Sequence, residues 1–378
     1  MTYTIIGAGI GGLTTALALE KKGVDYKIFE KAPELNEVGA GIWLAPNALQ
    51  VLETLGISDE IQSNGNNINR ITLGKSDLTP LSDNLQDDIQ RKFGHSTVAI
   101  HRATLQKILF AHIPAAKIAL GKAFIGYEKP AGKKLTVKFS DGTTCETDYL
   151  IGADGIHSQV RAQLFPTSKT RYSGQTCWRG IAEYKLTDDF QHRGLELWGD
   201  QIRFGISAVD VNRVYWFAVA LAKANQRDDD QSLVKDKLST LFTGFHPIVK
   251  QLLSATKPTK IIRSDISDLH PLQNWFKDNI CLIGDAAHAT TPNMGQGGAQ
   301  AIEDAYYLSH LIAQHPNENV FPRFQQKRQK KVNTIVRQSW TTGKMAHWKY
   351  GRWWRDLLLK NIPKSILQKK MVELYQID

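Results

Sequence analysis

A glycine-rich turn near the N-terminus carries the first pattern that could do chemistry. Residues 7–12 read GAGIGG, follow a strand-like segment and open a helix-like one. In this context the first glycine permits a tight turn, the second lets the backbone approach a pyrophosphate, and free N–H groups at the helix start face the phosphates. Glu30 lies 18 residues after Gly12, where a carboxylate can accept hydrogen bonds from ribose hydroxyls. The pattern predicts a dinucleotide site, with a plain strand-to-helix turn as the alternative; its expected cofactor-binding residues are Gly7, Gly9, Gly11, Gly12, Glu30 and Lys31.

A second glycine-rich turn follows a buried-strand pattern late in the chain. Residues 279–288 read NICLIGDAAH, so a strand ends at Gly284-Asp285 and offers a carboxylate to a polyol chain. Residues 289–298 read ATTPNMGQGG and precede a helix, whose free N–H groups and dipole can stabilise a developing negative charge. The alternative is an ordinary glycine-rich connection, and we expect His288 to pack behind the loop. The candidate cofactor-binding residues here are Asp285, Pro292, Gly295, Gly297 and Gly298.

A third segment lies between these two. Residues 152–161 read GADGIHSQVR. Taken alone, this segment is a plain loop followed by a helix start, in which Ser158 or Asp154 caps the helix and Arg161 lies at the surface. A functional interpretation of this segment depends on the presence of the other two segments.

Together the three segments resemble the class A flavoprotein monooxygenases, which have the para-hydroxybenzoate hydroxylase fold, over nearly the whole chain. The resemblance implies that GAGIGG with Glu30 binds the ADP part of noncovalent FAD, that GADGIHSQVR and its Asp154 contact FAD and NAD(P)H, and that Asp285 holds the ribityl chain. Two further segments match the family, GAGIWLAPNALQVLETLG and HRATLQKIL. Arg102 in the second would be a partner of the ribityl chain or a phosphate.

Within the family, YSGQTCWRGI is similar to a segment of the branch that contains the FAD-dependent urate hydroxylases and zeaxanthin epoxidase. In the urate hydroxylases an arginine and a tyrosine twelve residues apart line the pocket, and Arg203 and Tyr215 have this spacing. The resemblance therefore makes Arg203 and Tyr215 the candidate catalytic and substrate-binding residues, with Cys177 and Pro292 also near the substrate. One departure puts urate in doubt, because Cys177 stands where the urate enzymes carry Asn before the Trp.

The geometry of Arg203 and Tyr215 depends on the hairpin between them. Side chains alternate faces along a strand, so a three-residue turn at 210–212 would pair Ser207 with Tyr215 and place Arg203 on the same face. A slip of one residue would separate the two faces. The alternatives are that Arg203 is a surface charge and that Tyr215 is packed in the core.

The elements that must position these residues alternate between strands and helices. We expect strands at 2–6, 25–29, 149–151 and 279–283, helices at 13–22, 47–55, 102–111 and 299–314, and a hairpin over 134–147 with an Asp-Gly turn. Residues 176–221 are strand-rich and read as an inserted antiparallel sheet. The expected fold class is α/β, a GR2-type Rossmann-like FAD-binding domain (1–70, 99–172 and 276–340) with an inserted antiparallel-sheet substrate domain (71–98 and 173–275) and C-terminal helices (341–378).

The composition of the chain limits the class of protein and the compartment that we expect. The chain has 378 residues, of which 42% are hydrophobic and 22% charged, an ordinary globular balance. It contains no run of about 18 uncharged apolar residues and no signal-peptide pattern at its start. Three scattered cysteines suit a reducing, cytoplasmic location and give neither a disulfide framework nor a metal motif. The net charge is +10, but no nucleic-acid-binding module accompanies it.

One C-terminal stretch, HWKYGRWWRDLLLK at 347–360, is both aromatic and basic. Such a stretch is more often a helix whose aromatic side chains cap a domain while its cations stay solvated. Binding to a membrane surface is the alternative.

The family resemblance implies the reaction. NAD(P)H reduces bound FAD, the reduced flavin adds O₂ to give a C4a-hydroperoxide, and one oxygen atom passes to an aromatic or heteroaromatic small molecule, with a urate-like substrate among the candidates. Two alternatives stay open at this point. One is an epoxidase of an apolar polyene, and the other is a flavin-binding NAD(P)H oxidase or sensor that hydroxylates nothing.

Overall fold

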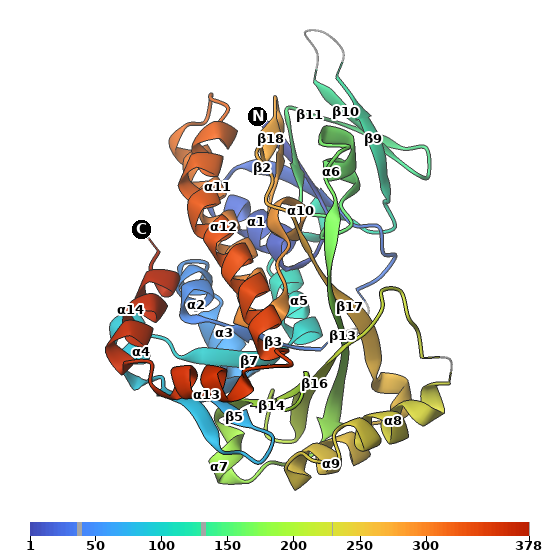
Figure 1. The fold of residues 1–378 in the computed structure, drawn as a ribbon. Coiled ribbons are helices and arrows are strands. Elements are labelled where there is room, and N and C mark those ends of the chain that lie inside the picture. Colours follow the sequence, from blue (N-terminus) through green and yellow to red (C-terminus); the bar gives the residue numbers. More distant parts are fainter. Residues whose placement is uncertain (36–39, 130–133, 229, 378) are drawn as a thin grey trace.

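Two large sheets organise the protein. The computed structural model describes residues 1–35, 40–129, 134–228 and 230–377, so Gly39 of the GAGIWL segment lies outside the described residues (Figure 1). A six-stranded, largely parallel sheet occupies the upper part of Figure 1, and a seven-stranded, largely antiparallel sheet occupies the lower part. This arrangement confirms the expected α/β class with an inserted antiparallel sheet.

The six-stranded sheet has the order β18-β19-β12-β1-β2-β8. β1 pairs in parallel with β2 on one side and with β12 on the other, and β12 pairs in parallel with β19. Its central strands are runs of buried residues, as expected where helices cover both faces. The strands are β1 Thr2–Ile6, β2 Asp25–Phe29, β8 Ile118–Ala119, β12 Tyr149–Gly152, β18 Phe276–Lys277 and β19 Ile280–Leu282.

Helix α1 (Ile10–Lys21) links β1 to β2 and begins three residues earlier than expected. The apolar stripe starts at Leu13, which is why the sequence favoured that residue. The helix nevertheless accommodates Gly11 and Gly12 in its first turn, because Gly9 has extended backbone angles and serves as the N-cap. The glycine-rich turn is therefore mostly the beginning of a helix, with its N–H groups directed back toward the end of β1.

The seven-stranded sheet has the order β17-β13-β16-β15-β14-β5-β6. In the β15–β16 hairpin Ser207 pairs with Tyr215, so the three-residue turn and the shared face are confirmed. One face of this sheet buries Phe204 and Trp216 in a core with helices α8 (Val234–Leu241) and α9 (Pro247–Ser254). The strands are β5 Arg70–Lys75, β6 Pro80–Leu85, β13 Thr170–Glu183, β14 Arg193–Trp198, β15 Ile202–Ala208, β16 Arg213–Leu221 and β17 Ile262–Leu269.

Two three-stranded sheets and the remaining helices complete the fold. The small sheets contain β3 Gly41–Leu44, β4 Asn66–Ile68 and β7 Thr97–His101, and β9 Phe124–Glu128, β10 Leu135–Phe139 and β11 Thr144–Thr147. The helices are α2 Pro46–Thr54, α3 Ser58–Ser63, α4 Asp87–Phe93, α5 Arg102–Ala111, α6 Gln159–Leu164, α7 Asp188–Gln191, α8 Val234–Leu241, α9 Pro247–Ser254, α10 Asp285–His288, α11 Gly297–Gln314, α12 Phe321–Ala346, α13 Arg352–Lys360 and α14 Lys364–Tyr375. Among the described residues, no helix has the length and apolar character needed to cross a membrane.

Several expected domain boundaries fall inside continuous elements. Those near residues 98, 172 and 340 lie within β7, β13 and α12. β13 runs from beside the parallel sheet into the large sheet, and a register shift between Tyr172 and Gln175 marks the transition (Figure 1). The division of the chain by residue number therefore remains a proposal.

Candidate active site

The three sequence segments converge at one edge of the parallel sheet. β1, β12 and β19 run in the same direction, so the loops that follow them leave from the same edge. The chain departs from β1 toward β2 on one side and returns to β12 on the other. A crevice at such a reversal of strand order is where open α/β sheets bind ligands.

The glycines of the first loop meet two different requirements. A Cβ on Gly12 would lie 1.9 Å from the carbonyl oxygen of Gly7, and a Cβ on Gly7 would lie 2.6 Å from that of Ala153. These two positions are thus glycine because the protein packs against itself there. A Cβ on Gly9 would meet no described atom within 4 Å. The space beside Gly9 is open, at a helix N-terminus, which fits the pyrophosphate of a dinucleotide.

Glu30 closes the first loop from the end of β2. Its carboxylate accepts hydrogen bonds from the backbone N–H of Ala8 at 2.7 Å and of Ala32 at 2.9 Å. Each carboxylate oxygen has a second lone pair, so Glu30 can hold the loop and still accept from a ribose hydroxyl. The neighbouring Lys31 is exposed.

Asp285 is the first residue of α10, directly after the end of β19 and Gly284. Its side chain is accessible to solvent, yet protein atoms surround it closely enough that desolvation raises the pKa of this carboxyl above its ordinary value. The positive charges of His288, Arg102 and Arg161 act in the opposite direction. Within the described part of the chain, the carboxylate has no hydrogen-bond donor. An enclosed acceptor of this kind fits the hydroxyl-bearing ribityl chain of FAD.

Helix α11 begins directly across from Asp285. A Cβ on Gly297 would lie 4.0 Å from Oδ1 of Asp285, so the first turn of the helix lies next to this carboxylate. Gly295 adopts a left-handed conformation with φ of 62°, and with the exposed Pro292 it forms the approach to the helix. A Cβ on Gly298 would lie 2.8 Å from Cδ1 of Ile42. The predicted loop thus leads into an eighteen-residue helix whose N-terminus lies beside the Asp285 carboxylate.

The middle segment, residues 152–161, forms hydrogen bonds that hold the start of α6 and the residue after Asp285 in place. Ser158 is the N-cap of α6, and its hydroxyl accepts from the Arg161 N–H at 2.8 Å. Asp154 supports this cap by accepting hydrogen bonds from the Ser158 hydroxyl at 2.5 Å and the Gln159 N–H at 2.7 Å. Arg161 is 5% exposed, and its Nη1 donates to the carbonyl of Ala286 at 3.0 Å. The alternative that Arg161 lies at the surface is wrong, because its guanidinium is buried and binds the carbonyl of the residue that follows Asp285. A cofactor-binding role for Asp154 remains a proposal.

Arg203 is buried between the large sheet and the α11 loop. It is 2% exposed, and its Nη1 contacts the Glu196 carboxylate at 3.0 Å. Its Nη2 donates to the side-chain oxygen of Asn293, which belongs to the Pro292–Gly298 loop. The alternative that Arg203 is a surface charge is wrong. The arginine connects the two parts of the site, but it carries its own counter-ion.

Tyr215 and Cys177 lie on the same face of the sheet as Arg203. The Tyr215 ring crosses Gly41, where a Cβ would approach it to 2.5 Å. Burial raises the pKa of the Tyr215 hydroxyl, against the attraction of the nearby Arg179. Cys177 is 1% exposed and packs with Val219 and Phe217 on this face, and burial raises its thiol pKa. Tyr215 is therefore half-buried beside β3, whereas Cys177 is covered by its neighbours on the same face.

Sequence reasoning missed several residues of this face. Glu196 and Asn293 come from β14 and from the α11 loop, and only the three-dimensional pairing brings them to Arg203. Trp43 donates from Nε1 to the Ser207 hydroxyl at 3.0 Å, joining β3 to β15. The signal for Trp43 was present, since it lies in the GAGIWL segment. No signal in the sequence marks Glu196.

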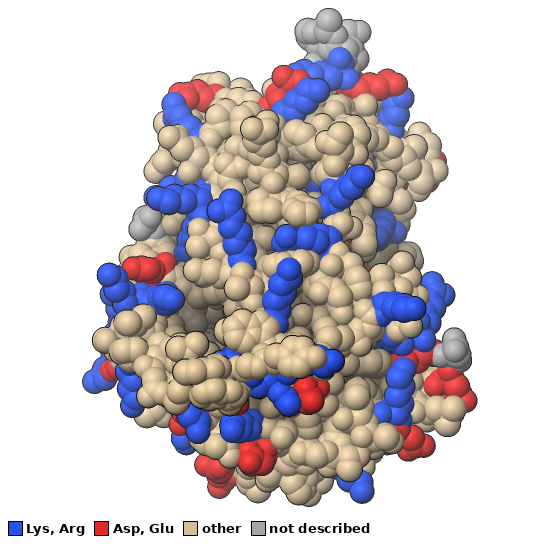
Figure 2. Space-filling model, viewed as in Figure 1, with Lys and Arg blue, Asp and Glu red and all other residues tan. Residues whose placement is uncertain are grey.

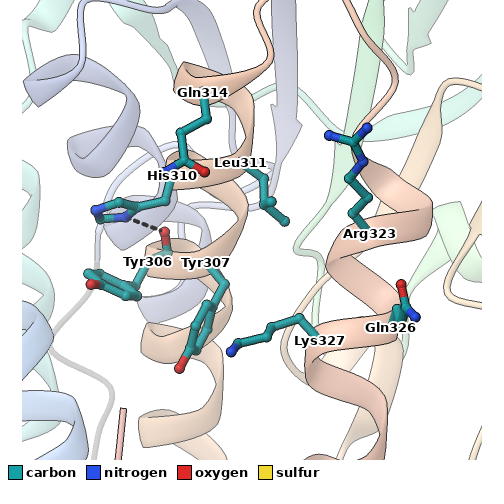
Figure 3. A pocket seen from close by; sticks show the side chains of 8 residues that line it. All are labelled: Tyr306, Tyr307, His310, Leu311, Gln314, Arg323, Gln326 and Lys327. Carbon is teal, nitrogen blue, oxygen red and sulfur yellow. Dashed lines mark hydrogen bonds between the residues drawn. The ribbon is translucent and has the colours of Figure 1, made fainter. Parts of the chain in front are cut away.

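A separate groove of about 670 Å³ lies between α11 and α12 (Figure 3). Figure 3 shows its side chains coming from the two helices, with the His310 ring hydrogen-bonded to the carbonyl of Tyr306 at 2.9 Å. None of the residues proposed for the cofactor or the substrate lines it. The described residues also contain no cluster of His, Cys, Asp and Glu suited to a metal ion.

Comparisons with known proteins bear on this geometry. A family model described as "FAD binding domain" matches residues 1–339. The aurachin C monooxygenase/isomerase of Stigmatella aurantiaca is 35% identical, over 95% of this chain and 94% of that protein. The 2-heptyl-3-hydroxy-4(1H)-quinolone synthase of Pseudomonas aeruginosa strain UCBPP-PA14 is 31% identical, over 97% of this chain and 95% of that protein. The crystal structure of Klebsiella pneumoniae HpxO with FAD and uric acid superposes with a TM-score of 0.90 at 26% identity, covering 99% of this chain and 96% of that chain.

Proposed function

The chain belongs to the FAD-binding-domain family of flavoprotein monooxygenases, and we propose that its substrate is an uncharged heteroaromatic ring that carries an apolar substituent. It is an FAD-dependent oxidoreductase with NAD(P)H as co-substrate. Bound FAD supplies the oxygen chemistry, which is activation of O₂ and transfer of one oxygen atom to the ring.

The protein's own residues bind, orient and exclude water. Asp285 accepts hydrogen bonds from the hydroxyl-bearing chain of the cofactor, and the first turn of α11 presents N–H groups to negative charge. The face of the large sheet that carries Tyr215 covers the reacting ring and keeps water away from it. No acid–base pair or nucleophile is required from the side chains.

One observation carries the choice of an uncharged substrate. The cationic Arg203 is buried and already paired with Glu196, so the two charges cancel. An anionic substrate would have to compete with Glu196 for the guanidinium, whereas a neutral ring needs no counter-charge. Half-buried side chains around Arg203 include the aromatic rings of Tyr215 and Phe217 on this face and of Trp43 on β3, beside Ile181 and Arg179. The names of two relatives support the same class, since 2-heptyl-3-hydroxy-4(1H)-quinolone is a heteroaromatic ring with an alkyl chain.

The test is the rate at which NAD(P)H reduces the bound flavin in the absence of O₂, with 2-heptyl-4(1H)-quinolone or urate added. We expect the quinolone to accelerate reduction and, once O₂ is admitted, to yield a hydroxylated product with little free peroxide. Acceleration by urate and none by the quinolone would overturn the proposed substrate class. Stoichiometric peroxide with every candidate would favour the oxidase or sensor alternative.

We also propose the cytoplasm as the compartment. The three cysteines are free thiols, and Cys177 and Cys281 are buried. A reducing compartment keeps such thiols unpaired.

A further inference from the structure

Helix α13 turns its apolar side away from the protein. Trp353, Trp354, Leu357 and Leu358 form one side of the helix and are 62%, 55%, 45% and 65% exposed. The expectation that these aromatic residues cap the domain is therefore wrong. The two indole rings stack on each other, with centroids 4.0 Å apart, rather than on the core.

The polar side of the same helix is fixed against the protein. Arg352 pairs with Asp200 at 3.0 Å, and Arg355, which is 3% exposed, donates to the carbonyl of Ala346 at 3.2 Å. Leu359 packs in a small cluster with Leu81 and Trp198. A surface helix of a globular protein normally has the reverse orientation, with its apolar side inward. Because its inner side is anchored by several contacts, the outward apolar side belongs to the folded state.

The apolar surface continues beyond both ends of α13. We call it the tryptophan surface, and it consists of Trp348, Tyr350, Trp353, Trp354, Leu357, Leu358, Ile362 and Ile366. These eight are half of the 16 large hydrophobic side chains that are exposed in the described part of the chain, and they lie within 19 residues. In Figure 2 the surface over α13 is mostly tan, with blue groups beside it. A concentrated patch of this kind marks an interaction site rather than the scattered exposure found on any protein.

The charges around the tryptophan surface have one sign. From Trp348 to Lys370 the chain contains seven Lys and Arg residues and a single acid, Asp356. Asp356 is bound by Arg355 at 2.8 Å. The exposed cations include Lys349, Lys360 and Lys364. A second copy of the chain docked symmetrically on this face would bring like charges together, whereas an anionic surface would complement them.

We propose that the tryptophan surface binds the surface of an anionic phospholipid bilayer. The Trp, Tyr, Leu and Ile side chains enter the boundary between headgroups and acyl chains, where indole and phenol rings are favoured. The lysines contact the anionic headgroups. Helix α13 lies in the plane of the membrane and does not cross it.

The tryptophan surface is close to the substrate side of the enzyme. The Arg355 guanidinium lies 4.8 Å from the ring centroid of Trp198. Trp198 donates from Nε1 to Glu196 at 2.8 Å, and Glu196 holds Arg203. On the basis of the proposed function, an apolar substrate dissolved in the bilayer would reach the site from this side. The membrane contact itself does not depend on the substrate.

The experiment is flotation of the FAD-loaded enzyme with lipid vesicles, without substrate. The vesicles contain either phosphatidylcholine alone or equal parts of phosphatidylcholine and phosphatidylglycerol. We expect binding to the anionic vesicles that weakens with added salt, and little binding to phosphatidylcholine alone. Leu357→Ser/Leu358→Ser should weaken the binding roughly tenfold or more, with unchanged FAD content.

The matched control is Leu221→Ser/Leu233→Ser, which changes two leucines of similar exposure, 48% and 59%, outside the tryptophan surface. It should bind vesicles like the parent. Equal flotation of both double variants, or no flotation of the parent at low salt, would overturn the proposal. Failure to bind vesicles together with a dimer that Leu357→Ser/Leu358→Ser dissociates would assign the face to a second copy instead. Because substrate is absent, none of these results depends on the proposed reaction.

Discussion

At the scale of single residues, the charge of the buried Arg203–Glu196 pair decides which substrates can be held. Glu196→Gln keeps an acceptor for Arg203 and for the Trp198 indole but removes the negative charge. We predict that this variant loses activity on a neutral quinolone and gains affinity for an anionic ring, because the guanidinium then lacks a counter-ion. A charge-assisted contact is worth about 1.5–3 kcal/mol, so the expected shift is roughly ten- to hundredfold. Ligand dissociation constants measured by flavin absorbance check this, and an unchanged preference would remove Arg203 from substrate selection.

Asp285 is the candidate acceptor for the ribityl chain, and its carboxylate has no hydrogen-bond donor among the described protein residues. Asp285→Ala should therefore weaken FAD retention by about 1.5–3 kcal/mol, or roughly ten- to hundredfold, through loss of a hydrogen-bonded carboxylate. The measurement is FAD dissociation followed by fluorescence. The FAD-free variant should unfold at the same denaturant concentration as the FAD-free parent or a higher one, since desolvation disfavours this carboxylate. An unchanged FAD affinity would exclude Asp285 from the site.

His347 is a buried neutral histidine whose protonation links stability to pH. Burial, with the positive charges of Arg203 and Arg355, lowers its pKa to about 4, although Nδ1 donates to the carbonyl of Gly343 at 2.9 Å. The unfolded chain binds the proton at higher pH than the folded one, so stability is complete above about pH 6.5 and falls as the pH drops toward 4. We predict a loss on the order of 3 kcal/mol over this range. His347→Gln should flatten that part of the curve of unfolding free energy against pH, and an equal slope in both proteins would contradict the assignment.

At the scale of elements, two glycines at the start of α1 have different roles. Gly12 is required by the packing of the fold, whereas Gly9 leaves room for the ligand. Gly9→Ala adds a methyl group into open space, so the FAD-free protein should keep its stability within about 1 kcal/mol while FAD binding weakens at least tenfold. Gly12→Ala places the methyl group 1.9 Å from a carbonyl oxygen and should destabilise the FAD-free protein itself. Thermal unfolding without FAD, together with FAD titration, distinguishes the two. Normal FAD binding by Gly9→Ala would mean that the pyrophosphate lies elsewhere.

Elements with a local signal could be predicted from the sequence, and contacts between distant elements could not. The strand, the glycine-rich turn and Glu30 lie within 30 residues, so their geometry follows from the motif alone. The hairpin register followed from the three-residue turn, which sets the pairing of Ser207 with Tyr215. The pairing of Arg203 with Asn293 joins residues 90 apart in the chain and depends on how α11 meets the large sheet. The cap at Ser158, supported by Asp154, is one of the alternatives that the sequence offers, but the burial of Arg161 depends on the position of Ala286.

At the scale of the whole molecule, a buried network of charged side chains joins the long helices α11 and α12 to the end of strand β19 in the parallel sheet. Arg328 on α12 is 1% exposed and contacts both carboxylates of α11, Glu303 and Asp304, the latter at 2.9 Å. Asp304 also binds His288 at 2.6 Å and the N–H of Gly284 at 2.9 Å, directly before Asp285. His288 therefore packs behind the loop, as expected from the sequence. The network links α12 through α11 to the strand end that carries Asp285.

Removal of Arg328 should therefore affect stability first and the cofactor second. Arg328→Met keeps much of the side-chain volume but leaves Glu303 and Asp304 with fewer positive partners in a buried setting. Breaking such a network by deleting one partner costs about 3–5 kcal/mol, so we predict a loss of that size in the unfolding free energy of the FAD-free protein. Arg337→Met on the exposed side of α12 is the matched control and should change it by less than about 0.5 kcal/mol. Because excess FAD binds only the folded state, it should raise the midpoint of Arg328→Met unfolding. A variant as stable as the Arg337→Met control would show that the two helices are held by their apolar contacts alone.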